Sequence, residues 1–193
     1  MTDEIRLDIG CGPNKREGHI GVDKFPMAGV DVLLDLEDWV KPWPWEDGSV
    51  TSVHCSHTLE HLTSGNSGGR VRFFNELFRV LKVGGTAQII TPSWSHNRAY
   101  GDFDHKWPAV SEMMYWYLDR KWRKANAPHD DAEVRADGYG LNCHFLWQIV
   151  NSFDPNDPWL IGRNPETLNV MLGRNINSAV DLIANLTKVE EQA

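Results

Sequence analysis

The chain has 193 residues, a formal net charge of −8 and 41% hydrophobic residues. This length and composition predict one globular domain over 1–193 and exclude a disordered chain. No apolar run approaches the ~20 residues that a membrane-spanning helix needs. The acidic balance gives no reason to expect a nucleic-acid partner, because binding to a phosphate backbone usually requires a basic face.

The cysteines and the N-terminus predict a cytoplasmic location. Cys11, Cys55 and Cys143 are widely spaced and form no CxxC pair, which is typical of a reducing compartment. The opening residues, MTDEIRLD, lack a signal-peptide pattern. The one dense basic segment, 119–124, predicts a solvated helix face, and most of the nine tryptophans are expected to be buried structural anchors.

Short apolar runs bounded by turn residues predict five strands in the first half, at 5–10, 19–23, 30–36, 49–56 and 84–92. Between the last two, residues 70–82 place apolar side chains on one helical face, and Gly84 and Gly85 end that helix. This alternation predicts an α/β fold with a mainly parallel sheet covered by helices on both faces. Only about nine residues separate Gly10 from Ile20, so the first crossover is expected to be a loop.

The second half follows a different pattern. Residues 107–127 predict a helix that starts near Pro108, and residues 141–153 predict a late strand. Residues 164–188 predict a C-terminal helix. Gly173 lies inside it, at a cost of about 1 kcal/mol relative to Ala, so a kink or a split is expected there.

Acidic residues at successive strand ends are the most informative feature. In an open α/β sheet, ligands bind across the carboxyl ends of the strands. Asp8, Asp23, Asp35 and the pair Ser56–His57 would meet at one such crevice. A carboxylate after the second strand suits ribose hydroxyls, and one after the third suits an exocyclic amine such as that of adenine.

The charge of the crevice discriminates between cofactors. A pyrophosphate binder needs a full GxGxxG turn and a helix N-terminus directed at the phosphates. Here Gly10-Cys11-Gly12 is followed by Pro13 and Asn14, with no third glycine, and acids surround the turn. This arrangement favours a cationic nucleoside such as S-adenosylmethionine, which carries a sulfonium, over a nicotinamide dinucleotide.

Five motifs then occur in a familiar order: LDIGCGPN, GVD, DLED, PWEDGSVTSVHCSHTLEHL and ELFRVLKVGG. In this the chain resembles the class I S-adenosylmethionine-dependent methyltransferases, and in particular small bacterial and bacteriophage methyltransferase-domain proteins. The resemblance covers roughly residues 5–95, which would be the cofactor-binding half of a Rossmann-like fold. Residues 96–193 would form an acceptor-side and C-terminal helical elaboration. The family commonly ends in an antiparallel strand pair, of which only the strand near 141–153 is evident.

The resemblance implies a role for each cofactor-site candidate. Asp8, Gly10, Cys11 and Gly12 would form the loop on the methionine side. Asp23 would hold the ribose, and Asp35 with the Leu36 backbone would meet adenine. Ser56 and His57 would lie near the methionine moiety or the reactive methyl group.

The segment HCSHTLEHL also raises the question of a metal. Its His54, His57, Glu60 and His61 could supply nitrogen and oxygen ligands. Certain relatives, the small-RNA 2′-O-methyltransferases and the ubiquinone-pathway O-methyltransferases, bind a divalent ion through an ExxEH pattern here. In this chain the pattern reads His57-x-x-Glu60-His61, so one ligand has changed. The sequence therefore favours structural or substrate-facing roles and no metal, with a set of His57, Glu60 and His61 as the alternative.

The acceptor side is the least specified part. Residues after the fifth strand, where the family often places acceptor contacts, are His96, Asp102, Asp104, His105 and Trp107. Methyl transfer needs little beyond alignment, and a general base matters only where the acceptor is protonated. The sequence names no catalytic residue; its candidates are His57, His61 and His105.

The leading hypothesis is a methyltransferase that uses S-adenosylmethionine and transfers the methyl group by in-line displacement to a small molecule or to a protein or glycan group. DNA base methylation is disfavoured, because the fourth strand ends in CSHTLE rather than [DN]PP[YF] and no Pro-Cys pair is present there. A non-catalytic binding or assembly protein with the same fold is the alternative. A nicotinamide-dependent oxidoreductase would need the missing phosphate loop. The oligomeric state is not predicted.

Overall fold

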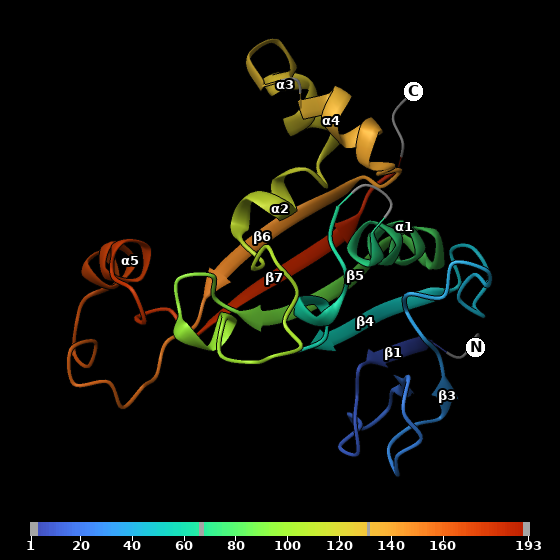
Figure 1. The fold of residues 1–193 in the computed structure, drawn as a ribbon, viewed down its shortest axis with the longest axis horizontal. Helices are drawn as coiled ribbons and strands as arrows, with labels where there is room; N and C mark the ends of the chain where they lie inside the picture. The colour runs from blue at the N-terminus through green and yellow to red at the C-terminus, as the bar shows by residue number, and fades with distance from the viewer. Residues whose placement is uncertain (1–3, 66–67, 131, 191–193) are drawn as a thin grey trace.

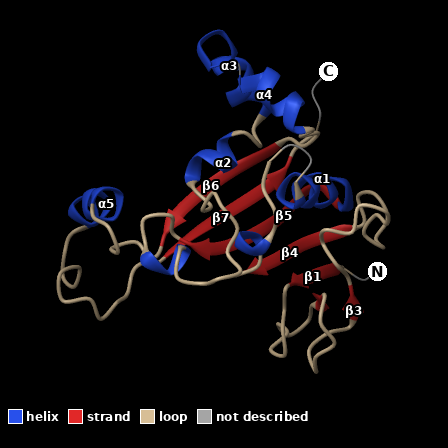
Figure 2. Ribbon diagram, in the orientation of Figure 1, coloured by secondary structure: helices blue, strands red, loops and turns tan. Residues whose placement is uncertain are grey.

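The computed structural model describes residues 4–65, 68–130 and 132–190. Its centre is a seven-stranded sheet in the order β3-β2-β1-β4-β5-β7-β6. The strands are β1 (Ile5–Ile9), β2 (Ile20–Asp23), β3 (Val32–Leu33), β4 (Val50–Ser56), β5 (Leu81–Pro92), β6 (Phe145–Asn151) and β7 (Asp181–Lys188). The first five strands pair in parallel, and β7 runs antiparallel to both β5 and β6. The predicted α/β class with a mainly parallel sheet is confirmed (Figure 2).

In the described residues, the helices come after β4 and are interspersed with β5, β6 and β7 (Figure 1). They are α1 (Gly69–Val80), α2 (Glu112–Trp116), α3 (Arg120–Asp130), α4 (Ala132–Tyr139) and α5 (Pro165–Arg174), with short 3-10 turns η1 (Leu59–His61) and η2 (Asn97–Ala99). The structure describes every residue between β1 and β2, and none of them is helical, so the first crossover is a loop as predicted. None of the helices found in the described ranges is long and apolar enough to cross a membrane.

Loops replace the missing crossover helix by packing on each other. Asp31 accepts hydrogen bonds from the backbone N–H of Gly21 at 2.7 Å and from the Lys15 ammonium at 2.7 and 3.0 Å, so it ties the β1–β2 loop to the β2–β3 loop. A Cβ at Gly29 would lie 2.7 Å from the carbonyl oxygen of Gly12, so only glycine permits this approach.

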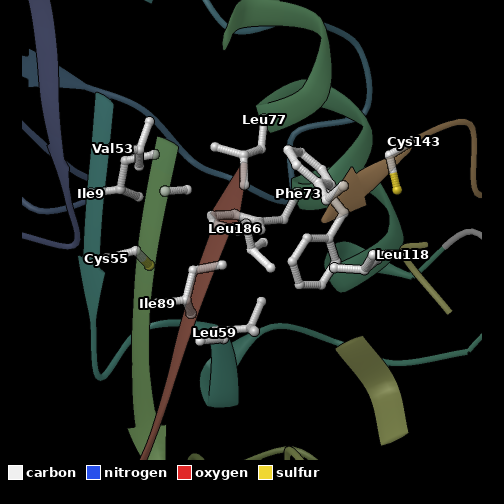
Figure 3. Packing of buried hydrophobic residues seen from close by; sticks show 14 of the residues in the cluster. Ile9, Val53, Cys55, Leu59, Phe73, Leu77, Ile89, Leu118, Cys143 and Leu186 are labelled. Carbon is white, nitrogen blue, oxygen red and sulfur yellow. The ribbon is translucent and has the colours of Figure 1, made fainter. Parts of the chain in front are cut away.

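The core lies between one face of the sheet and α1 with α2 (Figures 1 and 3). Side chains at alternate strand positions point toward α1 and are buried. Examples that face Phe73 and Leu77 of this helix are Ile9, Val53, Ile89 and Leu186. Trp43 is also buried and makes edge contacts with Trp45 and Phe73, as expected for a structural anchor. The expectation does not hold for most tryptophans, because four others, Trp39, Trp94, Trp107 and Trp159, are exposed.

The opposite face of the sheet is polar. A shallow groove there is lined by side chains of β4, β5 and β7 and by Arg16 and His19 of the β1–β2 loop. Gln88 donates a hydrogen bond to Asn185 across β5 and β7 at 3.1 Å. The other face carries α1 and α2 (Figure 1), whereas α5 packs with Leu160 and Ala179 in a separate small cluster.

Two predictions for the second half need correction. The helix predicted over 107–127 begins at Glu112 and is interrupted after Trp116, where Tyr117 and Leu118 form a turn before α3. The predicted solvated face at 119–124 contains Arg123, which is 1% exposed and donates to the carbonyl oxygen of Tyr117 at 2.5 Å. Burial of its stem and satisfied donors explain this placement.

The helix predicted over 164–188 is correct only in its first half. Helix α5 ends at Arg174, next to Gly173, and residues 181–188 form β7. Leu182, Ala184 and Leu186 are buried at alternate positions of this strand. The chain therefore has the antiparallel strand pair that the sequence only half revealed.

Candidate functional site

A cleft of about 290 Å³ opens at the carboxyl ends of β1, β2 and β4, as the strand-end acids predict. Its walls come from the turns after these strands, from η1 and from the loop after β5. The lining residues are Ile9, Gly10, Val22, Asp23, Lys24, Phe25, Met27, Leu34, Asp35, Leu36, Glu37, His57, Thr58, His61, Leu62 and Asp104. Four of them are carboxylates and one is a lysine, a balance that favours a cationic ligand.

The turn after β1 is held close to η1. Gly10 has φ +70°, and its N–H donates to the carbonyl oxygen of Val22 at 2.7 Å. A Cβ at this position would collide with the Thr58 hydroxyl. The glycine therefore lets the chain turn sharply while the β4 loop packs directly on it.

Asp23 is fixed at the end of β2 by two backbone donors. The N–H of Gly12 donates to its Oδ2 at 3.1 Å and the N–H of Phe25 donates to its Oδ1 at 3.0 Å. A carboxylate offers about four lone-pair positions, so each oxygen keeps one for a ligand. Asp35 is more exposed and accepts from the N–H of Glu37 at 2.9 Å.

The predicted cofactor residues divide into two groups. Gly10, Asp23, Asp35, Leu36 and His57 line the cleft; the others lie beside it. Among the latter, the Asp8 carboxylate is 4% exposed and accepts from the N–H of Arg16 at 2.8 Å, so it secures the loop. The Cys11 thiol lies 3.5 Å from the carbonyl oxygen of Gly29. The N–H of Gly12 donates to Asp23, and Ser56 is the last residue of β4 and does not line the cleft.

Sequence reasoning missed several wall residues. Phe25 and Met27, which are 58% and 37% exposed, flank the cleft directly after the β2 acid. Their position two and four residues after Asp23 was the available signal. Glu37 and Thr58 lie within recognised motifs. Asp104, which the sequence placed among the acceptor contacts after the fifth strand, lines the cofactor cleft instead.

His57 lies at the mouth of the cleft in a strained backbone conformation. It has φ 51°, which is uncommon for a non-glycine residue and is often found at functional sites. Its Nδ1 is 3.3 Å from Glu60 Oε1 and its Nε2 is 3.8 Å from Asp181 Oδ1. The interaction with Glu60, supported by Asp181, raises the pKa of the His57 imidazole.

The structure brings all three catalytic candidates to one place. The rings of His61 and His105 contact each other edge to face, with centroids 4.8 Å apart. Glu60, whose carboxylate is buried beneath them, also contacts His57. Of the wider histidine set, His54 points into the groove on the opposite face, where burial, together with Arg16, lowers its pKa. A metal set that includes His54 is therefore wrong.

A second, more open groove of about 700 Å³ begins beside His57. It runs between the loop after β5 and the β6–α5 loop, and its lining includes His96, Arg98, Asp154 and Asp181. Asp181 joins the two sites, since it lies 3.8 Å from His57 and 3.4 Å from Arg98. Of the other expected acceptor contacts, Asp102 caps the turn at Asp104 and Trp107 is 79% exposed.

The chain matches a known family over its first half. Residues 7–89 match the family profile described as a methyltransferase domain. A search of curated proteins found no significant match.

Solved structures resemble the fold along nearly the whole chain. A SAM-dependent methyltransferase from Archaeoglobus fulgidus shares 21% identity at a TM-score of 0.60, over 97% of this chain and 87% of that one. The YcgJ protein from Bacillus subtilis shares 16% identity at a TM-score of 0.52, over 97% and 93%. A third match is a chain of the complex between the Haloferax volcanii Trm112 methyltransferase activator and the putative methyltransferase. It shares 16% identity at a TM-score of 0.54, over 99% of this chain and 84% of that one.

These findings agree with the sheet order and with the position of the cleft. Residues 7–89 match the methyltransferase-domain profile, and the chain has the Rossmann-like fold of the S-adenosylmethionine-dependent methyltransferase structure described above. The recognition made from the five sequence motifs is confirmed.

Proposed function

We propose that the cleft binds S-adenosylmethionine and that the protein transfers its methyl group to an acceptor bound on the His57 side. The observation that carries the proposal is the convergence of Gly10, Asp23 and Asp35 on one acid-lined cleft at the carboxyl ends of parallel strands. At about 290 Å³, the cleft lies near the lower end of the range for small-molecule sites.

The residues of the cleft fit this cofactor. Asp23 would accept from the ribose hydroxyls, and Asp35 would accept from the adenine amine, with Phe25 and Met27 against the base. The absence of a Cβ at Gly10 gives the methionine end access to the backbone. Asp23, Asp35, Glu37 and Asp104 give the walls a net negative charge that attracts a sulfonium and repels a pyrophosphate.

When bound, the cofactor supplies an electrophilic methyl group on its sulfonium. The protein must then orient the acceptor in line with that methyl group and exclude water. His57, at the junction of the cleft and the more open groove, is placed to contact the acceptor. A base is required only for an acceptor that is protonated at working pH, and His57, His61 and His105 remain the candidates.

The acceptor we propose is a small molecule or a protein or glycan group. The groove beside His57 is open and lined mostly by polar and charged residues, which suits a hydrophilic acceptor. The net charge of −8 disfavours nucleic acid, because a phosphate backbone would meet acidic rather than basic walls. We also propose a cytoplasmic location, supported by three cysteines that are all free thiols.

Titration calorimetry with S-adenosylhomocysteine tests the proposal. We expect wild-type protein to bind one molecule per chain and Asp23→Asn to bind at least tenfold more weakly. The variant loses a charged acceptor, and a hydrogen bond to a charged group contributes about 1.5–3 kcal/mol. Asp47→Asn is the matched control, since Asp47 is exposed and pairs with Arg79 away from the cleft.

Two results would contradict the cofactor assignment: no binding by wild-type protein, or equal binding by wild type and Asp23→Asn. In the first case the non-catalytic binding or assembly protein becomes the better account. Transfer of a radiolabelled methyl group to fractions of a cell extract would then identify the acceptor for a protein that binds the cofactor.

A further inference from the structure

We infer that Glu60, His61 and His105 hold a divalent transition-metal ion between the cofactor cleft and the acceptor groove. One ligand atom from each of these three side chains lies within 4.8 Å of the others. Ligand atoms of a tetrahedral ion bound at 2.0–2.2 Å lie about 3.3–3.6 Å apart, so the three side chains would close around the ion by up to about 1 Å. The sequence alone had favoured no metal and had offered His57 where the structure offers His105.

The buried carboxylate of Glu60 is the first support. Glu60 is 4% exposed, and neither of its carboxylate oxygens has a hydrogen-bond partner in the described part of the chain. Burial of a carboxylate is costly unless a cation compensates it. His57 lies 3.3 Å from Oε1 and reaches only that oxygen. The guanidinium of Arg70 is committed to backbone carbonyl groups.

The orientation of His105 is the second support. Its Nδ1 lies 3.1 Å from the carbonyl oxygen of Ala99. Because a carbonyl oxygen only accepts, Nδ1 carries the hydrogen and donates it, which leaves the Nε2 lone pair free for a ligand. A backbone carbonyl that fixes the tautomer in this way is the usual partner of a metal-bound histidine.

The scaffold around the three ligands is rigid. The Arg70 side chain is 4% exposed and donates to the carbonyl oxygens of Glu60, Leu62, Lys106 and Pro108. The N–H of Lys106 also donates to the carbonyl oxygen of Glu60 at 2.9 Å. These bonds join the η1 segment to the loop after β5, and so they fix His61 against His105 before any ion arrives.

The ligand set selects the kind of ion. Two imidazoles and one carboxylate are typical of Zn²⁺, Mn²⁺ or Fe²⁺ sites, whereas Mg²⁺ prefers oxygen ligands. Three protein ligands leave coordination positions open. Since His61 and Asp104 also line the cleft, an open position would face the bound substrates. Resting on the proposed function, the ion would hold and polarise an oxygen atom of the acceptor.

The experiment uses untagged protein treated with chelator and desalted, then titrated with ZnCl₂ or MnCl₂ alone in a calorimeter. We expect one ion per chain, and at least 100-fold weaker binding by Glu60→Gln and His105→Gln. The control His19→Gln changes a histidine on the β1–β2 loop, outside both sites, and is expected to bind like wild type. A rise in Tm with metal should follow the same order among the four proteins.

Circular dichroism and urea unfolding of each metal-free variant keep the result interpretable. A folded Glu60→Gln protein that binds metal as tightly as wild type would overturn the site, as would wild-type protein that binds no ion. Titration with S-adenosylhomocysteine separates the two proposals. Nucleoside binding without metal binding overturns the metal site alone; metal binding without nucleoside binding overturns the proposed function alone.

Discussion

Substitution of Arg70 by methionine tests the prediction that one buried side chain fixes the geometry of the site. Arg70 lies in the first turn of α1 and is 4% exposed. Its four hydrogen bonds run from 2.6 Å, to Pro108, to 3.3 Å, to Glu60, and all the acceptors are backbone carbonyl oxygens. Methionine keeps an unbranched apolar stem of similar length and removes every donor.

The expected loss of stability follows from these bonds. A hydrogen bond from a charged donor contributes about 1.5–3 kcal/mol, but water replaces part of the loss at carbonyl groups that become accessible. We therefore expect about 3–5 kcal/mol for the whole side chain. For a protein of this size, 1 kcal/mol shifts Tm by about 2–4 °C, which gives a decrease of about 10 °C.

Thermal and urea unfolding, followed by circular dichroism, measure this change. Arg70→Lys should fall between wild type and Arg70→Met, because an ammonium reaches fewer of the four acceptors. Arg6→Met is the control: Arg6 is half-exposed and pairs with the exposed Glu4, so its effect should stay within about 0.5 kcal/mol. A Tm of Arg70→Met within 3 °C of wild type would refute the argument that Arg70 holds the two segments together.

Three further predictions concern Gly10, Glu76 and the cysteine thiols. Gly10→Ala should lose S-adenosylhomocysteine binding and should lose more stability than Gly18→Ala. Both glycines have positive φ (70° and 73°), but of the two only Gly10 has a neighbour, Thr58, where a Cβ would lie. Equal losses of stability would show that the collision with Thr58 is relieved at no cost. Glu76→Gln should lower the free energy of unfolding by about 1–2 kcal/mol at pH 7, because bonds from Arg79 and the Trp43 N–H hold the pKa of Glu76 below its ordinary 4.5 in spite of its burial. The stabilisation from ionised Glu76 is present above the unfolded-state pKa and is lost as pH falls through the lower folded-state pKa. The difference in unfolding free energy between wild type and Glu76→Gln should therefore shrink below about pH 4. A difference that stays constant down to about pH 3 would contradict the role of the Glu76 charge. Finally, a thiol reagent at pH 8 should modify Cys11 slowly and should leave Cys55 and Cys143 unmodified until the protein unfolds. The reason is that burial raises the pKa of all three thiols, that of Cys143 to about 12. Rapid modification of all three thiols in the native protein would contradict this burial.

The sequence predicted the first half of the fold because its signals are local. Strands at 5–9 and 50–56 are short apolar runs between turn residues, and α1 carries a clear 3.6-residue period. Strand β7 was missed because Ala179, Leu182, Ile183 and Leu186 also fit a helical period. The strand is identified by the alternation of buried and partly exposed side chains along β7. This alternation arises from the pairing of β7 with β5 on one side and β6 on the other, which the sequence does not reveal.

The site was predictable to the same extent. Asp23, Asp35 and His57 follow strands directly, and the order of parallel strands brings strand ends together. Arg70 brings Glu60 and His61 together with His105 by donating hydrogen bonds to the backbone carbonyl oxygens of Glu60 and Lys106. Every residue has a backbone carbonyl group, so the sequence gives no sign of these contacts. Asp181 reaches His57 only because β7 lies beside β5, and that strand was not recognised.

The central claim is that the cleft between the β1, β2 and β4 turns holds S-adenosylmethionine. A crystal structure of the protein with S-adenosylhomocysteine tests it most directly. We expect the ribose hydroxyls at Asp23, the adenine at Asp35 and the sulfur at the end of the cleft nearest His57. Density for the nucleoside at another surface, or an empty cleft in crystals grown with millimolar nucleoside, would contradict it.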